Sequence, residues 1–189
     1  MVRFKQVTLI LVCLISWVSN AQDTKKERDW KLNATLAFAP GLLTENTQTI
    51  QLHGYLGYLH DRIHIRGDGF YYLTAFGDRP RFDMNHQLYA GAFYHFTDTR
   101  FQPYLGFQPG IAIARSSEYG TLGDSTSSDL EYKIAANPIG SAVGGFSYYG
   151  EKYFYFFVEG RYIFGQHKAN TYPVYLDEMR FSFGLGFFF

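Results

Sequence analysis

Two segments of the sequence each place a basic and an acidic residue two positions apart. Arg66 and Asp68 form one such pair, and Glu159 and Arg161 form the other. In an extended chain, residues i and i+2 point to the same face, so each pair would project opposite charges from one surface. If the two pairs meet inside a protein, they predict a buried salt-bridge network that fills the interior. If they line an open lumen, they predict a gate or a proton path.

Three histidines could either hold a metal ion or complete hydrogen bonds. His53, His64 and His95 each share the phase of the polar residues in their own segment. Neutral imidazole is a common metal ligand, but histidines in a polar core also satisfy neighbouring donors and acceptors. We favour the second interpretation and expect neither a metal nor another cofactor.

These residues lie in segments whose apolar side chains recur at every second position. In one segment, Ile63 and Ile65 alternate with His64 and Arg66. A period of two indicates β-strands with one apolar face. Similar segments begin near residues 30, 50, 87, 101, 154 and 180.

The remaining strand, sixth in chain order, is expected at about 130–148, where the alternation is weakest. The Asn137-Pro138 and Gly144-Gly145 pairs blur its phase. Glycine or proline inside a strand pattern often marks a β-bulge. We therefore expect a bulge in this strand.

The placement of charge indicates which face of the strands meets water. A soluble barrel such as a lipocalin would hold the apolar residues inside and expose its polar residues to water on the outside. Here the apolar phase carries no charge in the central stretches of the regular strands, whereas a lipid-facing Arg or Lys near the middle of a bilayer would cost about 2–4 kcal/mol. We therefore assign the apolar phase to lipid and the polar phase to the interior. The residues assigned to this interior polar network are Lys31, His53, His64, Arg66, Asp68, His95, Glu159, Arg161 and Arg180.

Length and composition favour one all-β domain. The chain has 189 residues, with 19 Phe, 16 Tyr and 19 Gly against 6 Pro and 3 Met, and aromatic residues favour strands. A formal net charge of zero gives no electrostatic reason to bind nucleic acid. After the first twenty residues, no apolar run approaches the ~18 residues that a membrane helix requires.

The N-terminal segment has the features of an export signal. Arg3 and Lys5 form a basic start, residues 7–18 form an apolar stretch, and Ala21 offers a small residue for cleavage. We expect a cleavable signal peptide at 1–21, a short polar lead-in at 22–29 and one domain at 30–189. Cys13, the single cysteine, would leave with the signal peptide.

The connections between the expected strands alternate between tight turns and long polar loops. Long loops are expected at 74–84, 115–130 and 165–178. This asymmetry is typical of outer-membrane barrels, which have short periplasmic turns and longer outer loops. We therefore predict a single closed antiparallel up-and-down transmembrane β-barrel of eight strands in the cell outer membrane. Aromatic residues at the strand ends next to the short turns are expected to form a girdle: Trp30, Tyr58, Phe96, Phe101, Phe154, Phe187 and Phe189.

Three pieces of the sequence resemble known outer-membrane barrels. The spacing of Ser182, Gly184, Phe187 and Phe189 resembles the C-terminal targeting signature of these proteins. The segments FQPYLG at 101–106 and FVEGRY at 157–162 resemble strands of the OmpA/OmpX-like barrels of the porin superfamily. The resemblance implies an eight-stranded barrel surrounded by outer-membrane lipid and lipopolysaccharide, and inserted by the barrel-assembly machinery.

One further resemblance concerns catalysis. His167 resembles the histidine of a lipid A deacylase, but Ala169 stands where that enzyme has its serine. An esterase needs a nucleophile within hydrogen-bond reach of its base, so we expect no enzyme.

The sequence therefore favours a non-enzymatic barrel with a filled interior and a structural or surface-interaction role. The alternatives are a narrow channel or small-molecule binder and, more remotely, a lipid A-modifying enzyme. The sequence indicates no particular partner for the loops.

Overall fold

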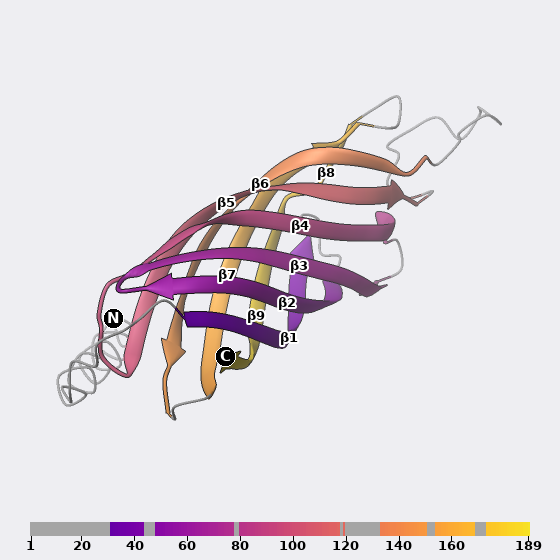
Figure 1. Ribbon diagram of the computed structural model, residues 1–189. Helices are drawn as coiled ribbons and strands as arrows, with labels where there is room; N and C mark the ends of the chain where they lie inside the picture. Colours follow the sequence, from indigo (N-terminus) through magenta and orange to yellow (C-terminus); the bar gives the residue numbers. More distant parts are fainter. Residues whose placement is uncertain are drawn as a thin grey trace, which may run out of the picture.

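The computed structural model describes residues 31–43, 48–77, 80–117, 119, 133–150, 154–168 and 173–189, and these residues form β-strands and their connections (Figure 1). The prediction of an all-β fold is confirmed. The described residues contain no helix long and apolar enough to cross a membrane. The expected signal peptide, the lead-in and Trp30 lie outside the described residues.

The strands are long and follow one another as antiparallel neighbours. They are β1 (Lys31–Leu43), β2 (Gln48–His60), β3 (Ile63–Phe76), β4 (Phe82–His95), β5 (Phe101–Ser116), β6 (Ala135–Tyr148), β7 (Phe154–His167), β8 (Val174–Tyr175) and β9 (Glu178–Phe188).

The sheet closes on itself as an eight-stranded barrel. β1 pairs with both β2 and β9, and β6 pairs with both β5 and β7, so no long strand is left at an edge. β8 pairs with β7 in the same register as β9 does. Thus β8 and β9 are one strand interrupted at Leu176 and Asp177, and the prediction of a closed antiparallel eight-stranded barrel is confirmed.

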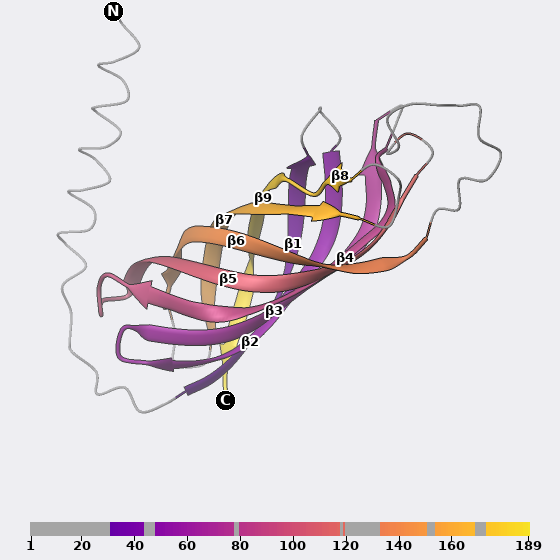
Figure 2. The same cartoon turned by 90° about the horizontal axis from the view of Figure 1, so that it is seen from above.

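The register fixes the shape of the barrel. Following paired residues once around the wall from Leu32 leads back to Leu42, ten residues further along β1. A stagger of this kind tilts the strands by about 35–45° from the barrel axis, and Figure 2 shows the resulting oblique course of the strands. The residues of this ladder are Leu32, Tyr58, Ile65, Ala92, Phe107, Ala142, Tyr162, Met179 and Leu42.

Side chains alternate between a polar interior and an apolar outer wall. Leu56 on the outside is 63% exposed, whereas the side chain of Arg161 on the inside is fully buried. In the described part of the strands, charged side chains reach the outer face only close to the loops, as Asp83 and Arg115 do. The predicted phase of the regular strands is confirmed.

The expected bulge in the sixth strand is wrong. β6 keeps an unbroken register with both neighbours, and it begins at Ala135 rather than near 130. The hydrophobic phase is blurred because Ile139 and Val143 point inward while small residues occupy the outer face. Pro138 lies beyond the last pair between β6 and β7, so its missing N–H removes no hydrogen bond on that side.

Two of the three expected long loops are shorter than predicted, because the strands extend into them. β3 and β4 leave only residues 77–81 as the connection predicted at 74–84. The loop predicted at 115–130 is displaced instead, because β5 continues to Ser116 and β6 begins at Ala135; between these strands, residues 117, 119, 133 and 134 are described. The loop predicted at 165–178 contains the end of β7 and all of β8. Two bulges, absent from the prediction, shift the register in β3 near Leu73 and in β4 near Asp83.

Candidate functional site: the charged interior

The two ionic pairs of β3 and β7 meet in the centre of the barrel. Arg66 Nη2 lies 3.0 Å from Asp68 Oδ1 and 2.6 Å from Glu159 Oε2. Arg161 Nη2 lies 3.1 Å from Asp68 Oδ1 and 3.3 Å from Glu159 Oε1. Each guanidinium therefore contacts both carboxylates, and all four side chains are buried. We call these four residues the central ionic cluster.

Neutral side chains add further hydrogen bonds to this cluster. Tyr104 Oη donates to Glu159 at 3.1 Å, and Arg161 Nη1 donates to Gln108 and Ser141 at 2.7 and 2.8 Å. His53 Nε2 lies 2.9 Å from Asp68 Oδ1. Buried charges are tolerated when their remaining donors and acceptors are also satisfied, and these partners satisfy most of them; among the described residues Arg161 Nε has no hydrogen-bond partner.

Aromatic rings cover the faces of the guanidinium groups. The Arg66 guanidinium carbon lies 4.1 Å from the ring centre of Tyr55 and 4.0 Å from that of Phe93. Arg161 lies 4.9 Å from Phe70. These cation–π contacts add attraction in a desolvated setting. They also fill the space on either side of each arginine.

A second ionic pair, closer to the loops, includes a residue that the sequence analysis missed. Arg180 Nε donates to Glu178 Oε1 at 3.2 Å, and Thr49 donates to the same oxygen at 2.7 Å. Arg180 also donates to Gln87 at 3.0 Å. Glu178 was assigned to a loop, although its spacing of two from Arg180 placed it on the inward phase.

The charges inside the strand wall balance. Among the described inward-facing strand residues, the buried charged side chains are three arginines and three carboxylates: Arg66, Arg161, Arg180, Asp68, Glu159 and Glu178. The side chain of Lys31, also assigned to the interior, lies outside the described residues. The arrangement can therefore hold the wall together without a net interior charge.

The structure brings His64 and His95 together and places His53 against the central ionic cluster instead. His53 contacts Asp68 of the central ionic cluster. His64 Nε2 lies 3.2 Å from Asn33 Oδ1, and the ring centres of His64 and His95 are 5.8 Å apart. Ligand atoms of His53, Asp68 and Glu159 do lie within 4.8 Å of one another. A cation there would face two arginines that already pair with both carboxylates, so the donor set does not suit a metal ion.

An apolar layer closes the interior above the charged groups, on the side of the loops. Val174 is 4% exposed, Leu176 is fully buried, and both pack with Phe82 and Ile163. The break between β8 and β9 permits this packing, because Leu176 N still donates to Gly165 O at 3.0 Å while Asp177 Oδ1 accepts from Gly165 N at 3.1 Å.

His167 occupies a structural position next to this apolar layer. Its side chain is fully buried, its Nδ1 lies 3.2 Å from Asn137 Nδ2, and its ring meets the ring of Phe82 edge-on. A general base must reach the proton that it removes from a substrate or nucleophile. This burial favours a packing role.

The residues of the C-terminal signature fall on both faces of β9. Phe187 and Phe189 are 48% and 78% exposed on the lipid-facing side, whereas Ser182 is buried. Gly184 faces inward against Ala37, and a Cβ added to it would lie 2.6 Å from the Ala37 Cβ. Gly184 is therefore also required by packing.

We predict that Gly184→Leu destabilises the barrel by about 1–3 kcal/mol through overpacking. Gly160→Leu is the matched control, because a Cβ there meets its nearest neighbour at 3.6 Å. Urea unfolding in phospholipid vesicles measures both variants. Equal stability of the two would contradict the packing role of Gly184.

Comparison with known proteins supports the fold. No family model and no curated protein matches the sequence. The structure is similar to Neisserial surface protein A (NspA), at 17% identity and a TM-score of 0.61 over 85% of this chain and 97% of that chain. It is also similar to the N-terminal β-barrel domain of Pseudomonas aeruginosa OprF, at 15% identity and a TM-score of 0.50 over 85% of this chain and 100% of that chain. The chain thus has the closed eight-stranded fold of the OmpA/OmpX-like outer-membrane β-barrels.

Proposed function

We propose that this chain is a non-enzymatic outer-membrane barrel with a structural or surface-interaction role. Its outer wall exposes large apolar side chains such as Leu36, Leu88 and Phe107 at 57–63%. A continuous apolar wall of this kind needs hydrocarbon around it. The loops between the strand ends then reach the outside of the cell, and the turns face the periplasm.

The filled interior is the observation that carries this proposal. The central ionic cluster occupies the middle of the barrel, and the apolar layer with Leu176 lies above it. Eight-stranded barrels have an interior just wide enough for side chains to fill. The described strands therefore enclose no wide lumen, and this favours interaction through the loops as the function.

Conductance measurements test the proposal against the channel alternative. We predict that the folded protein in planar bilayers shows no steady single-channel current. Slower migration after boiling, compared with the unboiled detergent extract, verifies that the barrel was folded. A steady current from such folded protein would overturn the filled-interior proposal and favour a narrow channel.

The partners follow from the same placement. Outer-membrane lipid and lipopolysaccharide would surround the apolar wall, and the barrel-assembly machinery would insert it through the C-terminal signature. Exposed Tyr175 on β8 and Ile134 next to β6, at 52% and 59% exposure, lie at the loop end of the wall. They favour contacts at the outer surface of the membrane.

A further inference from the structure

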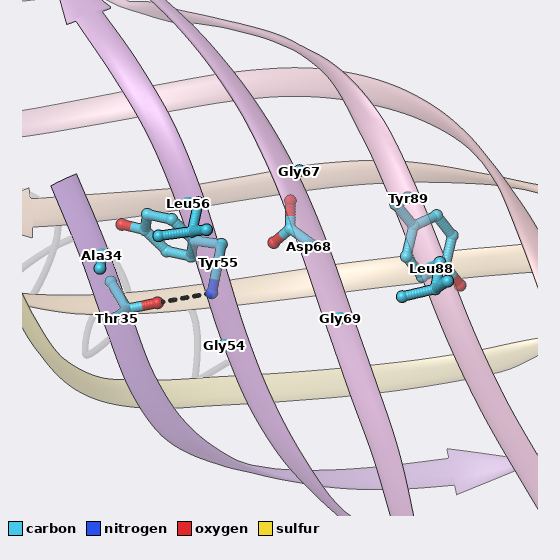
Figure 3. A pocket seen from close by; sticks show the side chains of 10 residues that line it. All are labelled: Ala34, Thr35, Gly54, Tyr55, Leu56, Gly67, Asp68, Gly69, Leu88 and Tyr89. Carbon is cyan, nitrogen blue, oxygen red and sulfur yellow. Dashed lines mark hydrogen bonds between the residues drawn. The ribbon is translucent and has the colours of Figure 1, made fainter. Parts of the chain in front are cut away.

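The outer wall carries a shallow groove that runs from Ala34 and Thr35 on β1 across β2, β3 and β4. Its floor is made of Gly54, Gly67 and Gly69, and Leu56 and Leu88 stand at its sides (Figure 3). The groove has a volume of about 410 Å³. It lies within the apolar wall, where the surrounding medium would be hydrocarbon.

Two of the three glycines of this floor are not required by packing, whereas at Gly54 an added Cβ would lie 3.1 Å from the Thr35 carbonyl oxygen, a tight contact. A Cβ on Gly69 would meet its nearest neighbour at 3.6 Å, and one on Gly67 at 3.7 Å, both ordinary contacts. Neither residue has a positive φ. Glycine within a strand often permits a close approach from outside, so the floor suits an external group lying against it.

A gap in the strand ladder lies directly above the groove. β3 and β4 pair only as far as Phe70 and Gln87, although β3 continues to pair with β2 up to Phe76 and β4 pairs with β5 from Phe82. No ladder pair joins 71–76 to 82–86 in the described chain. We call these two facing edges the β3–β4 seam.

The two bulges explain why the seam opens. One extra residue in β3 near Leu73 and one in β4 near Asp83 lie on its two sides. A bulge bends its strand and increases the local twist. Two bulges in facing strands therefore turn the strands apart and end their pairing.

His86 bridges the seam and leaves a donor facing outward. The backbone N–H of Tyr72 donates to His86 Nδ1 at 3.1 Å, and the imidazole stacks on Tyr71 with ring centres 4.4 Å apart. Because Nδ1 accepts a hydrogen bond, the proton of the neutral ring is on Nε2. Within the described residues, that Nε2–H has no hydrogen-bond partner. Tyr71 and His86 follow Gly69 and Leu88 along the outer face, so this donor stands at the head of the groove.

The inner side of the seam also keeps unused hydrogen-bonding capacity. Gln51 pairs with Tyr72 across β2 and β3, and Asn85 precedes His86 on β4. Both side chains are fully buried. Gln51 Oε1 and Nε2 and Asn85 Nδ2 have no partner within the described chain. Buried polar groups are normally satisfied, but these atoms lie on the inner side of the wall, so they do not contact a ligand held on its outer side.

We propose that the groove and the seam together bind a long-chain fatty acid. The acyl chain lies over Gly54 and Gly69 between the two leucines. The carboxylate accepts from His86 Nε2 and from backbone N–H groups of the seam. The proposal assumes the membrane placement proposed above and adds a defined ligand site to it.

Photocrosslinking with a diazirine-labelled palmitate tests this site. The chain is folded in phosphatidylcholine vesicles, labelled by light and mapped by peptide mass spectrometry. We expect crosslinks concentrated on β2, β3 and β4 and competed by unlabelled palmitate. Gly69→Leu fills the groove and is expected to reduce the labelling about tenfold, whereas Gly160→Leu, a glycine on the outer face of β7, leaves it unchanged.

The head-group contact has its own variant. His86→Phe keeps an aromatic ring beside Tyr71 but removes the donor, and we expect about tenfold weaker competition by palmitate. Even labelling around the whole outer wall, equal competition by methyl palmitate, or no effect of Gly69→Leu would each overturn the site. Heat-modifiable migration checks that every variant is folded, so a folded barrel without labelling refutes this site and leaves the proposed membrane function standing.

Discussion

Replacing Glu159 by alanine is expected to destabilise the barrel by about 3–5 kcal/mol, the usual effect of removing one partner from a buried ion pair. Glu159 contacts Arg66 at 2.6 Å and Arg161 at 3.3 Å, and all three side chains are buried. Its loss leaves two guanidinium groups with Asp68 as their single remaining carboxylate in the cluster. It also removes the acceptor for the Tyr104 hydroxyl.

Urea unfolding in phospholipid vesicles, followed by the change in electrophoretic mobility, gives the free energy of unfolding for this variant. Asp83→Ala is the matched control, because it breaks an ion pair with Arg115 whose two side chains are each 45% exposed. Exposed pairs contribute about 0–1 kcal/mol. Similar losses in the two variants would show that the central ionic cluster does not stabilise the interior.

Placing an arginine on the outer wall at Val158 is expected to cost about 2–4 kcal/mol, the range for a lipid-facing arginine near the middle of a bilayer. Val158 is 40% exposed on β7 and pairs with Phe146 on one side and Phe183 on the other. Its neighbours offer no carboxylate on that face. This loss of stability arises only if the arginine is placed in hydrocarbon, so the variant tests which side of the wall touches lipid.

The same unfolding assay in vesicles measures Val158→Arg beside Tyr175→Arg. Tyr175 lies in β8, near the loops, and is 52% exposed. An arginine near the membrane surface costs about 0–1 kcal/mol. If both variants were as stable as the parent chain, or if the protein stayed folded in water without detergent, the outer wall would be water-facing.

The phase of most strands could be predicted because side-chain chemistry and strand geometry share a period of two. Arg66 and Asp68, and likewise Glu159 and Arg161, were predicted to share a face, and the fold places each pair on the inner side of its strand. The contact between the two pairs across the barrel could not be predicted in this way. Arg66 and Glu159 are 93 residues apart, and only the closed ladder determines that their strands face each other.

The parts that escaped prediction depend on tertiary contacts. Glu178 lies next to a polar loop, and although its spacing from Arg180 indicates a shared face, nothing local shows that Thr49 also contacts it. The bulges in β3 and β4 are defined by how each strand pairs with its neighbour, and the sequence of one strand alone does not show that pairing. In the other strands, most polar side chains point inward and most large apolar side chains point outward. β6 has Ile139 inside and small residues outside, so its hydrophobicity pattern did not indicate a regular strand.

The long reach of the central ionic cluster has a consequence for biogenesis. β3 and β7 each supply one arginine and one carboxylate, and the strands between them must be in place before Arg66 meets Glu159. Until then each strand holds a single ion pair, and charged side chains in hydrocarbon are costly even when they are paired. We therefore expect that the hairpins containing β3 and β7 do not enter the bilayer one at a time with their charged side chains facing lipid. We therefore expect membrane insertion and barrel closure to occur together. Whatever assists insertion has to keep the charged inner face of the partly formed barrel away from lipid until the last strand pairs.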